Sequence, residues 1–210
     1  MSDLLCSIRM TLNTLDWNNP SVCFRGVERL LSQINIQRNE VRHYFNSLAY
    51  SELQRRVELS HETATHYKWF VFKEPDFRYE IWLHEYKSSG LRRKGYAEVP
   101  HNHRYWFSSL ILHGGFNHNL FEVIPPNYED IIDSIRLTGV RRLSEGAIYT
   151  IDPDKVHSVG NIAEPTLTLI IRSKALKLHS ESFDEETNQV TRYVPFSSRI
   201  KDFSQITRLI

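Results

Sequence analysis

The sequence predicts a protein dominated by β-strands: one β-barrel domain with a helical N-terminal cap. Up to about residue 60, apolar residues recur at helical spacing, as Leu30, Leu31 and Ile34 do. After that, segments rich in Val, Ile, Tyr, Phe and Trp alternate with polar residues and are interrupted by Gly, Pro and Asn, which is typical of strands. Many short strands at this spacing favour a sandwich or barrel over alternating strands and helices. We therefore expect the cap at residues 1–66 and the barrel, with a C-terminal tail, at residues 67–210.

The same patterns place the individual elements. Helical spacing covers the stretches 27–34, 41–48 and 53–59. Turn signals divide the rest of the chain, among them Glu74-Pro-Asp, Gly114-Gly and Asp152-Pro-Asp. Between these turns we expect strands at 67–72, 78–86, 97–103, 106–113, 120–124, 135–143, 147–151, 157–161 and 166–172, and a last strand-like segment at 192–196.

The charge balance and the cysteine count argue against several classes of protein. With 26 Lys and Arg against 25 Asp and Glu, we expect no nucleic-acid partner and no binding to an acidic membrane surface. No apolar run is long enough to span a membrane, and the first residues lack the basic start of a signal peptide. Cys6 and Cys23 are too few for a disulfide framework. We expect both to be reduced thiols in a cytoplasmic protein.

Three histidines form the most informative pattern in the chain. His101-Asn-His103 follows Gly95, and His157 comes much later, followed by Asn161. Two histidines with one residue between them on an extended segment point to the same side, so both can bind one ion. A third histidine from a distant strand can then supply a third ligand on the same side of that ion. Neutral imidazole suits Fe, Zn, Cu and Ni. The pattern predicts a divalent-metal site with open positions at His101, His103 and His157, and Asn161 as a turn or supporting residue.

Two segments resemble the motifs of the cupin superfamily. Gly95–His103, with the pattern G-x5-H-x-H, resembles the first half of the first cupin motif. Gly146–Asn161, with the pattern G-x6-P-x3-H-x3-N, resembles the second motif, although the usual Gly between Pro and His is missing. The resemblance implies a jelly-roll barrel in which His101, His103 and His157 are the metal ligands.

The chain also resembles one branch of that superfamily, the cysteine dioxygenases. Many cupins add a Glu ligand four or five residues after the second His, but Phe107 and Ser108 stand there in this sequence. Three His without Glu are typical of the thiol dioxygenases, and the layout of helical N-terminus, motif strands and late strand is similar. The resemblance implies iron, O2 and a small-molecule substrate.

Departures from cysteine dioxygenase place cysteine itself in doubt as the substrate. Thr168, Ile170 and Arg172 stand where those enzymes carry a Ser-His-Tyr relay, and Ser108 stands where the Cys of their Cys-Tyr crosslink would be. Ile170 can neither donate nor accept a proton. We expect poor cysteine oxidation and an oxygenase that acts on a different small molecule.

Further candidate site residues lie on the expected strand 78–86. Trp82, His84 and Tyr86 share one face of it by their spacing of two, and the resemblance implies that this face lines the pocket. His84 is then either an acid or base beside the metal or a satisfied core histidine. Tyr86 is also a candidate catalytic residue, although barrel packing is the more common role for Tyr86 and Trp82 and is compatible with lining the pocket.

Arg172 is expected to point into the barrel, where a buried guanidinium must find an anion. That anion is either Glu80 or Glu98 in a structural ion pair, or the carboxylate or phosphate of a substrate. Lys68 is a weaker candidate for the same role, a cation in the barrel that must bind an anion. Of the remaining histidines, we expect His113 and His118 on the turn after the motif strand. We expect three others to lie on the surface: His43, His61 and His66.

The expected function is a non-haem Fe(II) cupin oxygenase that acts with O2 on a small, acidic substrate at the three-His site. Zn or Ni would suit the same ligands. One alternative is a metal-dependent isomerase, cyclase or lyase that uses no O2. The other is a cupin without catalytic activity that binds a ligand, because the fold alone hosts many functions.

Overall fold

The computed structural model describes residues 4–93, 95–124 and 134–194 of the chain. Within these ranges, the N-terminal segment is helical: α1 (Leu4–Asn13), α2 (Pro20–Ile36), α3 (Arg38–Asn46) and α4 (Tyr50–Glu58). The strands that follow are β1 (His61–Glu62), β2 (His66–Lys73), β3 (Tyr79–Tyr86), β4 (Phe107–His113), β5 (Gly115–Ile124), β6 (Ser134–Ser144), β7 (Ile148–Ile151), β8 (Val156–Gly160), β9 (Thr166–Ser173), β10 (Ser180–Phe183) and β11 (Val190–Tyr193). The prediction of a β-dominated chain with a helical N-terminus is confirmed.

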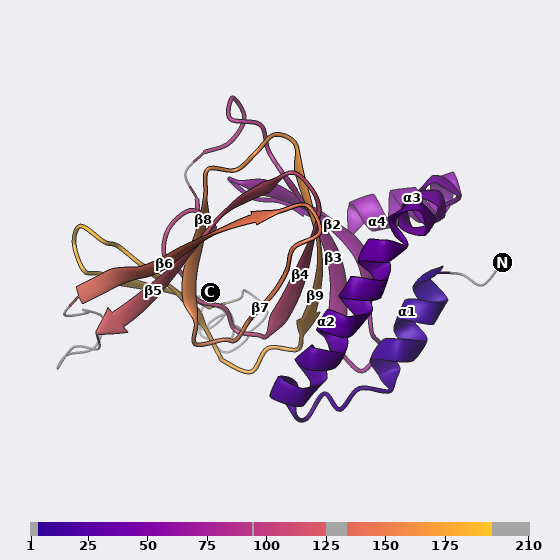
Figure 1. Ribbon diagram of the computed structural model, residues 1–210, viewed down its shortest axis with the longest axis horizontal. Helices are drawn as coiled ribbons and strands as arrows, with labels where there is room; N and C mark the ends of the chain where they lie inside the picture. The colour runs from indigo at the N-terminus through magenta and orange to yellow at the C-terminus, as the bar shows by residue number, and fades with distance from the viewer. Residues whose placement is uncertain (1–3, 94, 125–133, 195–210) are drawn as a thin grey trace, which may run out of the picture.

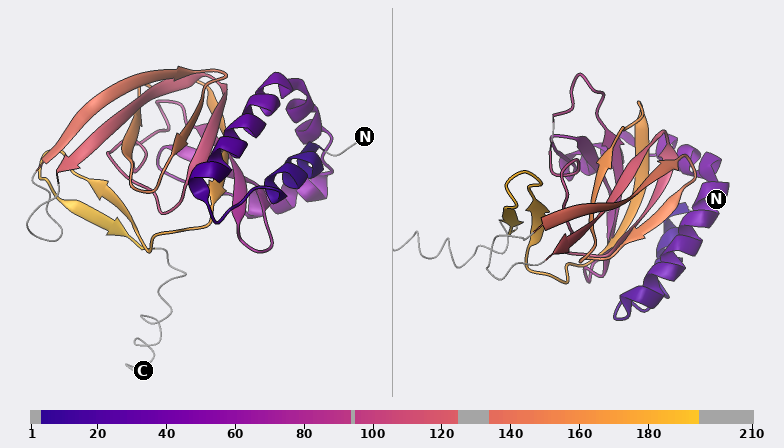
Figure 2. Two further views of the ribbon diagram at one scale, coloured as in Figure 1. Left: turned by 60° about the horizontal axis from the view of Figure 1, so that its bottom comes forward. Right: turned by 60° about the vertical axis from the view of Figure 1, so that its left-hand side comes forward.

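Two antiparallel sheets face each other and form the barrel (Figure 1). The larger sheet has the strand order β1-β2-β3-β9-β4-β7, and the smaller one has the order β6-β5-β8. A separate ribbon pairs β10 with β11. Figure 2 shows the helices gathered at one side of the barrel, while the long β5–β6 hairpin lies away from them. This arrangement is a jelly roll, in which side chains from both sheets line the interior.

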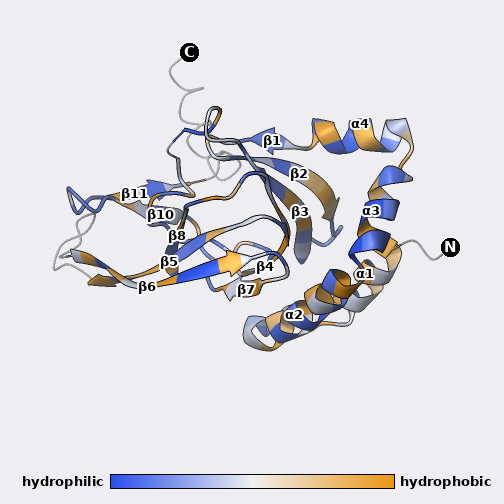
Figure 3. Cartoon of the chain, turned by 45° about the horizontal axis from the view of Figure 1, so that its top comes forward, coloured by the Kyte–Doolittle hydropathy of each residue, from blue (hydrophilic) through white to orange (hydrophobic). Residues whose placement is uncertain are grey.

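The helical segment packs on the outer face of the larger sheet. Pro20 stands in the first turn of α2, where its fixed φ suits a helix start. Polar and apolar residues alternate around α2 (Figure 3), and its apolar side contacts β4 and β7. That side joins one hydrophobic cluster with sheet residues such as Leu110 and Ile171. Trp17 adds to the cluster by stacking on Tyr79 of β3 at 5.1 Å between ring centroids. The cap therefore supports the sheet from outside and leaves the barrel interior free.

The expected strand at 97–103 is wrong, because this segment is a turn and a loop. The backbone N–H of Glu98 donates to the Gly95 carbonyl at 2.9 Å, which closes a turn, and Pro100 has no N–H for a ladder. Only His101 makes bridges, to His157 and to Ser182. The strands expected at 120–124 and 135–143 are longer, as β5 and β6 show. Residues 195–196 of the expected last segment lie outside the described residues.

Other sequence-based expectations concern cysteines and membrane spans. Cys6 is exposed and Cys23 is buried in α2, and both are free thiols. Burial raises the pKa of the Cys23 thiol to about 12, so this residue is an unreactive packing group. Among the described residues, no helix has both the length and the apolar character that a membrane crossing needs.

Replacing Leu31 of α2 by Ala should destabilise the protein by about 2–5 kcal/mol, because the side chain is fully buried between cap and sheet and its removal leaves a cavity. Denaturant-induced unfolding measures the change. Ile36 at the end of the same helix is 85% exposed, and its replacement by Ala is the matched control, with a change within about 0.5 kcal/mol. Equal effects of the two substitutions would contradict the packing described here.

Candidate metal centre

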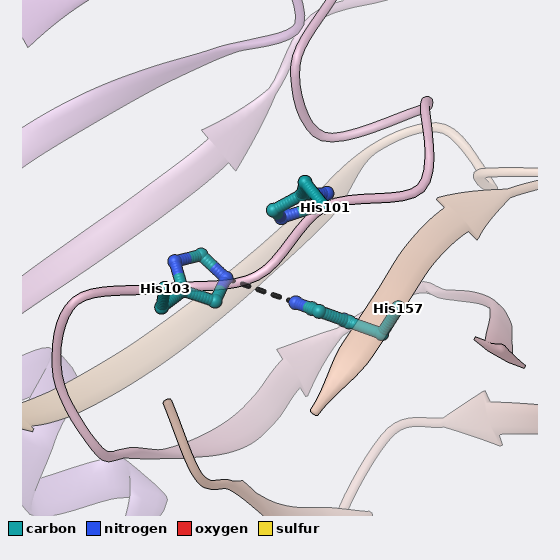
Figure 4. A group of neighbouring side chains, drawn as sticks. All are labelled: His101, His103 and His157. Carbon is teal, nitrogen blue, oxygen red and sulfur yellow. Dashed lines mark hydrogen bonds between the residues drawn. The ribbon is translucent and has the colours of Figure 1, made fainter. Parts of the chain in front are cut away.

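One pair of backbone hydrogen bonds brings the three predicted ligands together. His101 and His157 exchange N–H···O bonds of 2.9 Å each, which join the loop before β4 to strand β8. Residues directly opposite in an antiparallel pair place their side chains on the same face, and the two rings lie 4.5 Å apart. His103, two residues further along the loop, turns its ring toward the same point (Figure 4).

The residue between the two loop histidines holds the loop in place. The Asn102 side chain accepts from the backbone N–H of Glu181 at 2.8 Å and donates to the Glu181 carboxylate at 2.8 Å. The Tyr96 hydroxyl donates to the Asn102 carbonyl at 2.6 Å. Asn102 thus ties the loop to β10, and the backbone pair of His101 with His157 ties it to β8. The histidines are therefore held by strands on both sides of the loop.

The ring nitrogens have the geometry that a metal ion needs. The ligand atoms of all three histidines lie within 4.8 Å of one another, and Nε2 of His103 lies 2.9 Å from Nε2 of His157. Two ligands at right angles, each at about 2.1 Å from an ion, have their nitrogens about 3.0 Å apart. His101 donates from Nδ1 to the Val99 carbonyl at 2.9 Å, which leaves its Nε2 free. The three imidazoles therefore converge on one point and could hold one metal ion once the rings move slightly closer together.

Burial keeps these histidines in the form that binds metal. It lowers the pKa of His101 to about 4 and holds the pKa of His103 and of His157 well below the ordinary value. Each ring is thus neutral at pH 7, as a ligand must be. Among the described residues, the group that could hold a metal contains these three histidines and no carboxylate. The ion would keep its full charge and its remaining positions for other molecules.

A fourth histidine, His118, was misplaced on a turn by the sequence interpretation. It lies within β5, is buried, and its Nε2 is 2.9 Å from Nδ1 of His157. If His157 binds metal through Nε2, its Nδ1 carries the hydrogen and donates it to His118, which fixes tautomer and ring orientation. Burial lowers the pKa of His118 to about 4, helped by Arg141 and Lys155. Its alternation with Phe116 and Leu120 was the available sign of an inward position.

A cavity of about 400 Å³ opens in front of the three histidines. The expected site residues His84, Tyr86 and Arg172 all line it, together with Trp82. Further lining residues are Lys68, Tyr96, Arg104, Tyr105, Phe107, Tyr149, Val159 and Ile170. The catalytic roles of His84 and Tyr86 stay predictions, but their position beside the metal ligands is a fact of the structure.

Comparisons with known proteins concern the fold alone. No protein-family model and no curated protein matches the sequence. Among solved structures, KdgF from Halomonas sp. matches with 17% identity and a TM-score of 0.36 over 54% of this chain and 85% of its own. Ectoine synthase from P. lautus matches with 11% identity and a TM-score of 0.39 over 60% of this chain and 77% of its own. An RmlC-like cupin from Shewanella frigidimarina matches with 13% identity and a TM-score of 0.36 over 55% and 83%.

The facing antiparallel sheets and the histidine positions on loop and strand decide the architecture. The protein has a cupin fold. The predicted jelly roll is therefore confirmed, with a three-His group that could bind a metal ion. The resemblance to the cysteine dioxygenase branch is not tested by these comparisons and stays a prediction.

Arg172 has a partner within the protein. Its Nε donates to Oε2 of Glu80 at 2.8 Å, and Nη2 contacts the same oxygen. The two residues face each other across β3 and β9, and the guanidinium also lies over the Tyr105 ring, 4.6 Å from its centroid. The structural ion pair, one of the two interpretations from the sequence, is the one observed. The substrate-anchor role for Arg172 thus loses its premise of an unpaired charge.

Lys68 of β2 and Arg104 both line the cavity without an ion-pair partner among the described residues. Among the described residues Lys68 forms no ion pair, and the Tyr105 hydroxyl is the acidic group that raises its pKa. Burial lowers the pKa of Lys68, and Arg172 nearby adds repulsion. A partly desolvated cation in this position attracts an anion.

The expectation that His66 lies on the surface is also wrong. His66 begins strand β2, is buried, and stacks on His84 of β3 with ring centroids 4.5 Å apart. Its position was missed because the sequence analysis assigned residues up to 66 to the helical cap and its histidines to the surface. The two rings form a wall of the cavity that contributes no ligand to the three-His group.

Replacing His101, His103 or His157 singly by Ala should remove most of the bound metal, because two imidazoles hold an ion far less tightly than three. Elemental analysis of protein loaded with one equivalent of Fe(II) or Zn(II) measures the content. His113→Ala is the control, since that histidine lies exposed at the end of β4. Full metal content in the variant lacking all three ligands would contradict the assignment.

Replacing His118 by Phe should weaken metal binding by about 10–100-fold while the fold persists, because His157 loses the acceptor that orients it. Competition with a chromogenic zinc chelator measures the affinity. An affinity equal to that of the unchanged protein would show that His118 is only a packing residue.

Proposed function

We propose that this cupin is a non-haem Fe(II) oxygenase that acts on a small carboxylic acid bound beside the three-His site. The observation that carries the proposal is the donor set: three neutral, buried imidazoles on one face, with a 400 Å³ cavity in front of them. When bound, Fe(II) would supply positions for both a substrate atom and O2. The absence of a carboxylate from the group favours this use, since no protein anion neutralises the ion.

The chain's own residues bind and orient the substrate in this proposal. The Lys68 ammonium attracts the carboxylate, while the aromatic walls formed by Trp82, Phe107 and Tyr149 keep water from the reacting end. Glu80 holds Arg172 in the wall through an ion pair, so this cation is not the one that binds the substrate. Holding both ends of a small molecule restricts its orientation toward the metal.

The alternative is a metal-dependent isomerase, cyclase or lyase that uses no O2. One observation favours it: uncharged imidazoles of His66 and His84 line the cavity and could move a proton on the substrate. Oxygen uptake separates this alternative from the oxygenase.

Fe(II)-loaded protein should consume O2 when supplied with members of a panel of two- to six-carbon carboxylic acids, and Zn(II)-loaded protein should not. An oxygen electrode and product analysis by mass spectrometry measure the reaction. Cysteine belongs to the panel, and we expect little sulfinate from it because Ile170 stands in place of the relay histidine.

Two matched variants test whether Lys68 binds the carboxylate of the substrate. Lys68→Met should raise the concentration of acid needed for half-maximal O2 uptake by about 10–100-fold, the loss expected for one charge-assisted bond. Lys174→Met, at an exposed position, should leave it unchanged. Conversion of the same acids by the Zn(II) form without O2 would contradict the oxygenase and support the alternative.

A further inference from the structure

The cavity in front of the three histidines carries more positive charge than the proposed metal chemistry uses. Three cations line it, Lys68, Arg104 and Arg172, and no Asp or Glu is among its described lining residues. Arg172 is paired with Glu80 in the wall. Lys68 and Arg104 form no ion pair among the described residues. Two positive charges of the cavity are therefore uncompensated, and the proposed function uses one of them.

The two uncompensated cations come from different parts of the fold. Lys68 lies in β2, which has β1 and β3 as neighbours on its two sides. Arg104 follows His103 in the loop before β4, and its backbone carbonyl accepts from the N–H of Leu176 at 2.7 Å and from the N–H of Lys177 at 3.2 Å. Both backbones are thus fixed, so each side chain starts from a defined place in the cavity wall.

A ligand in the cavity can reach both charged groups. Among the described residues, the Lys68 ammonium has no partner and is not one of the enclosed polar atoms, so it keeps accessible surface. In Arg104 the enclosed nitrogen is Nη1, so Nε and Nη2 are the accessible ones. The Nε–Nη2 edge of a guanidinium is a rigid fork that matches two oxygens of a carboxylate or a phosphate. Arg104 therefore presents the edge that suits an anion.

Both cations are partly desolvated. Burial is the largest influence on the pKa of Lys68 and of Arg104 and lowers both, the Tyr105 hydroxyl raises them, and repulsion from Arg172 lowers them. A desolvated charge that lacks a counterion is costly, and a bound anion removes that cost. Because the two cations belong to separate elements, the arrangement favours a ligand with one anionic group for each of them.

We propose that the substrate of the three-His site is a small dianion, with one anionic group bound by Lys68 and the second bound by the Nε–Nη2 edge of Arg104. The inference rests on the proposed function, which assigns a carboxylate to Lys68. It deepens that function by adding a second negative group, a carboxylate or a phosphate, to the substrate class. Arg104 is then a binding residue that selects dianions over monoanions.

The test uses Zn(II)-loaded protein, in which the metal has no redox chemistry, and pairs of probes that differ by one charge at nearly equal size. The pairs are succinate with its monoamide succinamate, and glutarate with its monoamide glutaramate. Isothermal titration calorimetry measures the four dissociation constants. In at least one pair the dicarboxylate should bind about 10–100-fold more tightly than its monoamide, the gain from one charge-assisted interaction.

A further probe, 3-phosphonopropionate, is an analogue of succinate in which a phosphonate replaces one carboxylate. Tighter binding of this probe than of succinate would support the dianion with a phosphate as the second group. Tighter binding of succinate than of this probe and of succinamate would support the dianion with a second carboxylate.

Arg104→Gln should abolish the preference for the dicarboxylate and leave the binding of the monoamide unchanged, because glutamine keeps a polar side chain but no charge. Arg104→Lys, which restores the charge without the fork, should recover part of the preference. Arg142→Gln, at an exposed position of β6, is the matched control and should keep all of it. The zinc content should be the same in all of these variants, since none of them replaces a member of the three-His group.

Lys68→Met distinguishes a failure of this inference from a failure of the proposed function. It should weaken the binding of both members of a pair. Unchanged binding of all probes by Lys68→Met would show that the carboxylate anchor of the proposed function is wrong, and the assignment of one anionic group to each cation would fall with it. A preference that survives in Arg104→Gln, while Lys68→Met weakens both probes, would overturn the dianion and leave the proposed function intact. Equal binding of dicarboxylate and monoamide in both pairs, or binding of neither, would also overturn the dianion.

Discussion

The reciprocal backbone pairing of His101 with His157 is the constraint on which the metal centre depends. The loop that carries His101 and His103 makes no ladder of its own, so this pair and the bonds of Asn102 to Glu181 give it a fixed place. The pairing sets two imidazoles on one face, and the His118–His157 contact then fixes the orientation of the second ring. His118 and His157 lie in β5 and β8, two hydrogen-bonded strands of the barrel. Their side chains are therefore positioned by a rigid backbone.

Burial is the common cause of the chemistry in the cavity. It keeps the metal-binding histidines neutral and leaves the Lys68 ammonium poorly solvated. The Glu80–Arg172 pair shows how the barrel treats a charge that it can satisfy: the guanidinium lies across the strand from its acid. Among the described residues that line the cavity, Arg172 is thus paired with an acid, whereas Lys68 and Arg104 form no ion pair.

The convergence of His101, His103 and His157 could be predicted from the sequence because these residues stand at recognisable spacing, and it holds even though the segment 97–103 is a loop and not a strand. His66 and His118 were misplaced for different reasons. His66 was assigned to the cap, although it is buried in β2 beside β3, and His118 was assigned to a turn, although its alternation with Phe116 and Leu120 indicates an inward strand position. The partner of Arg172 was left open between Glu80, Glu98 and a substrate, because only the β3–β9 register decides which acid faces it.

The most direct test of a metal centre built by this loop-to-strand pairing is anomalous scattering at the iron edge from a crystal of the Fe(II)-loaded protein. We expect one strong peak at the point where the three rings converge, about 2.0–2.2 Å from a nitrogen of His101, His103 and His157. The His118–His157 contact should persist in the same crystal. An iron peak at other residues, or none at the three histidines, would contradict the account.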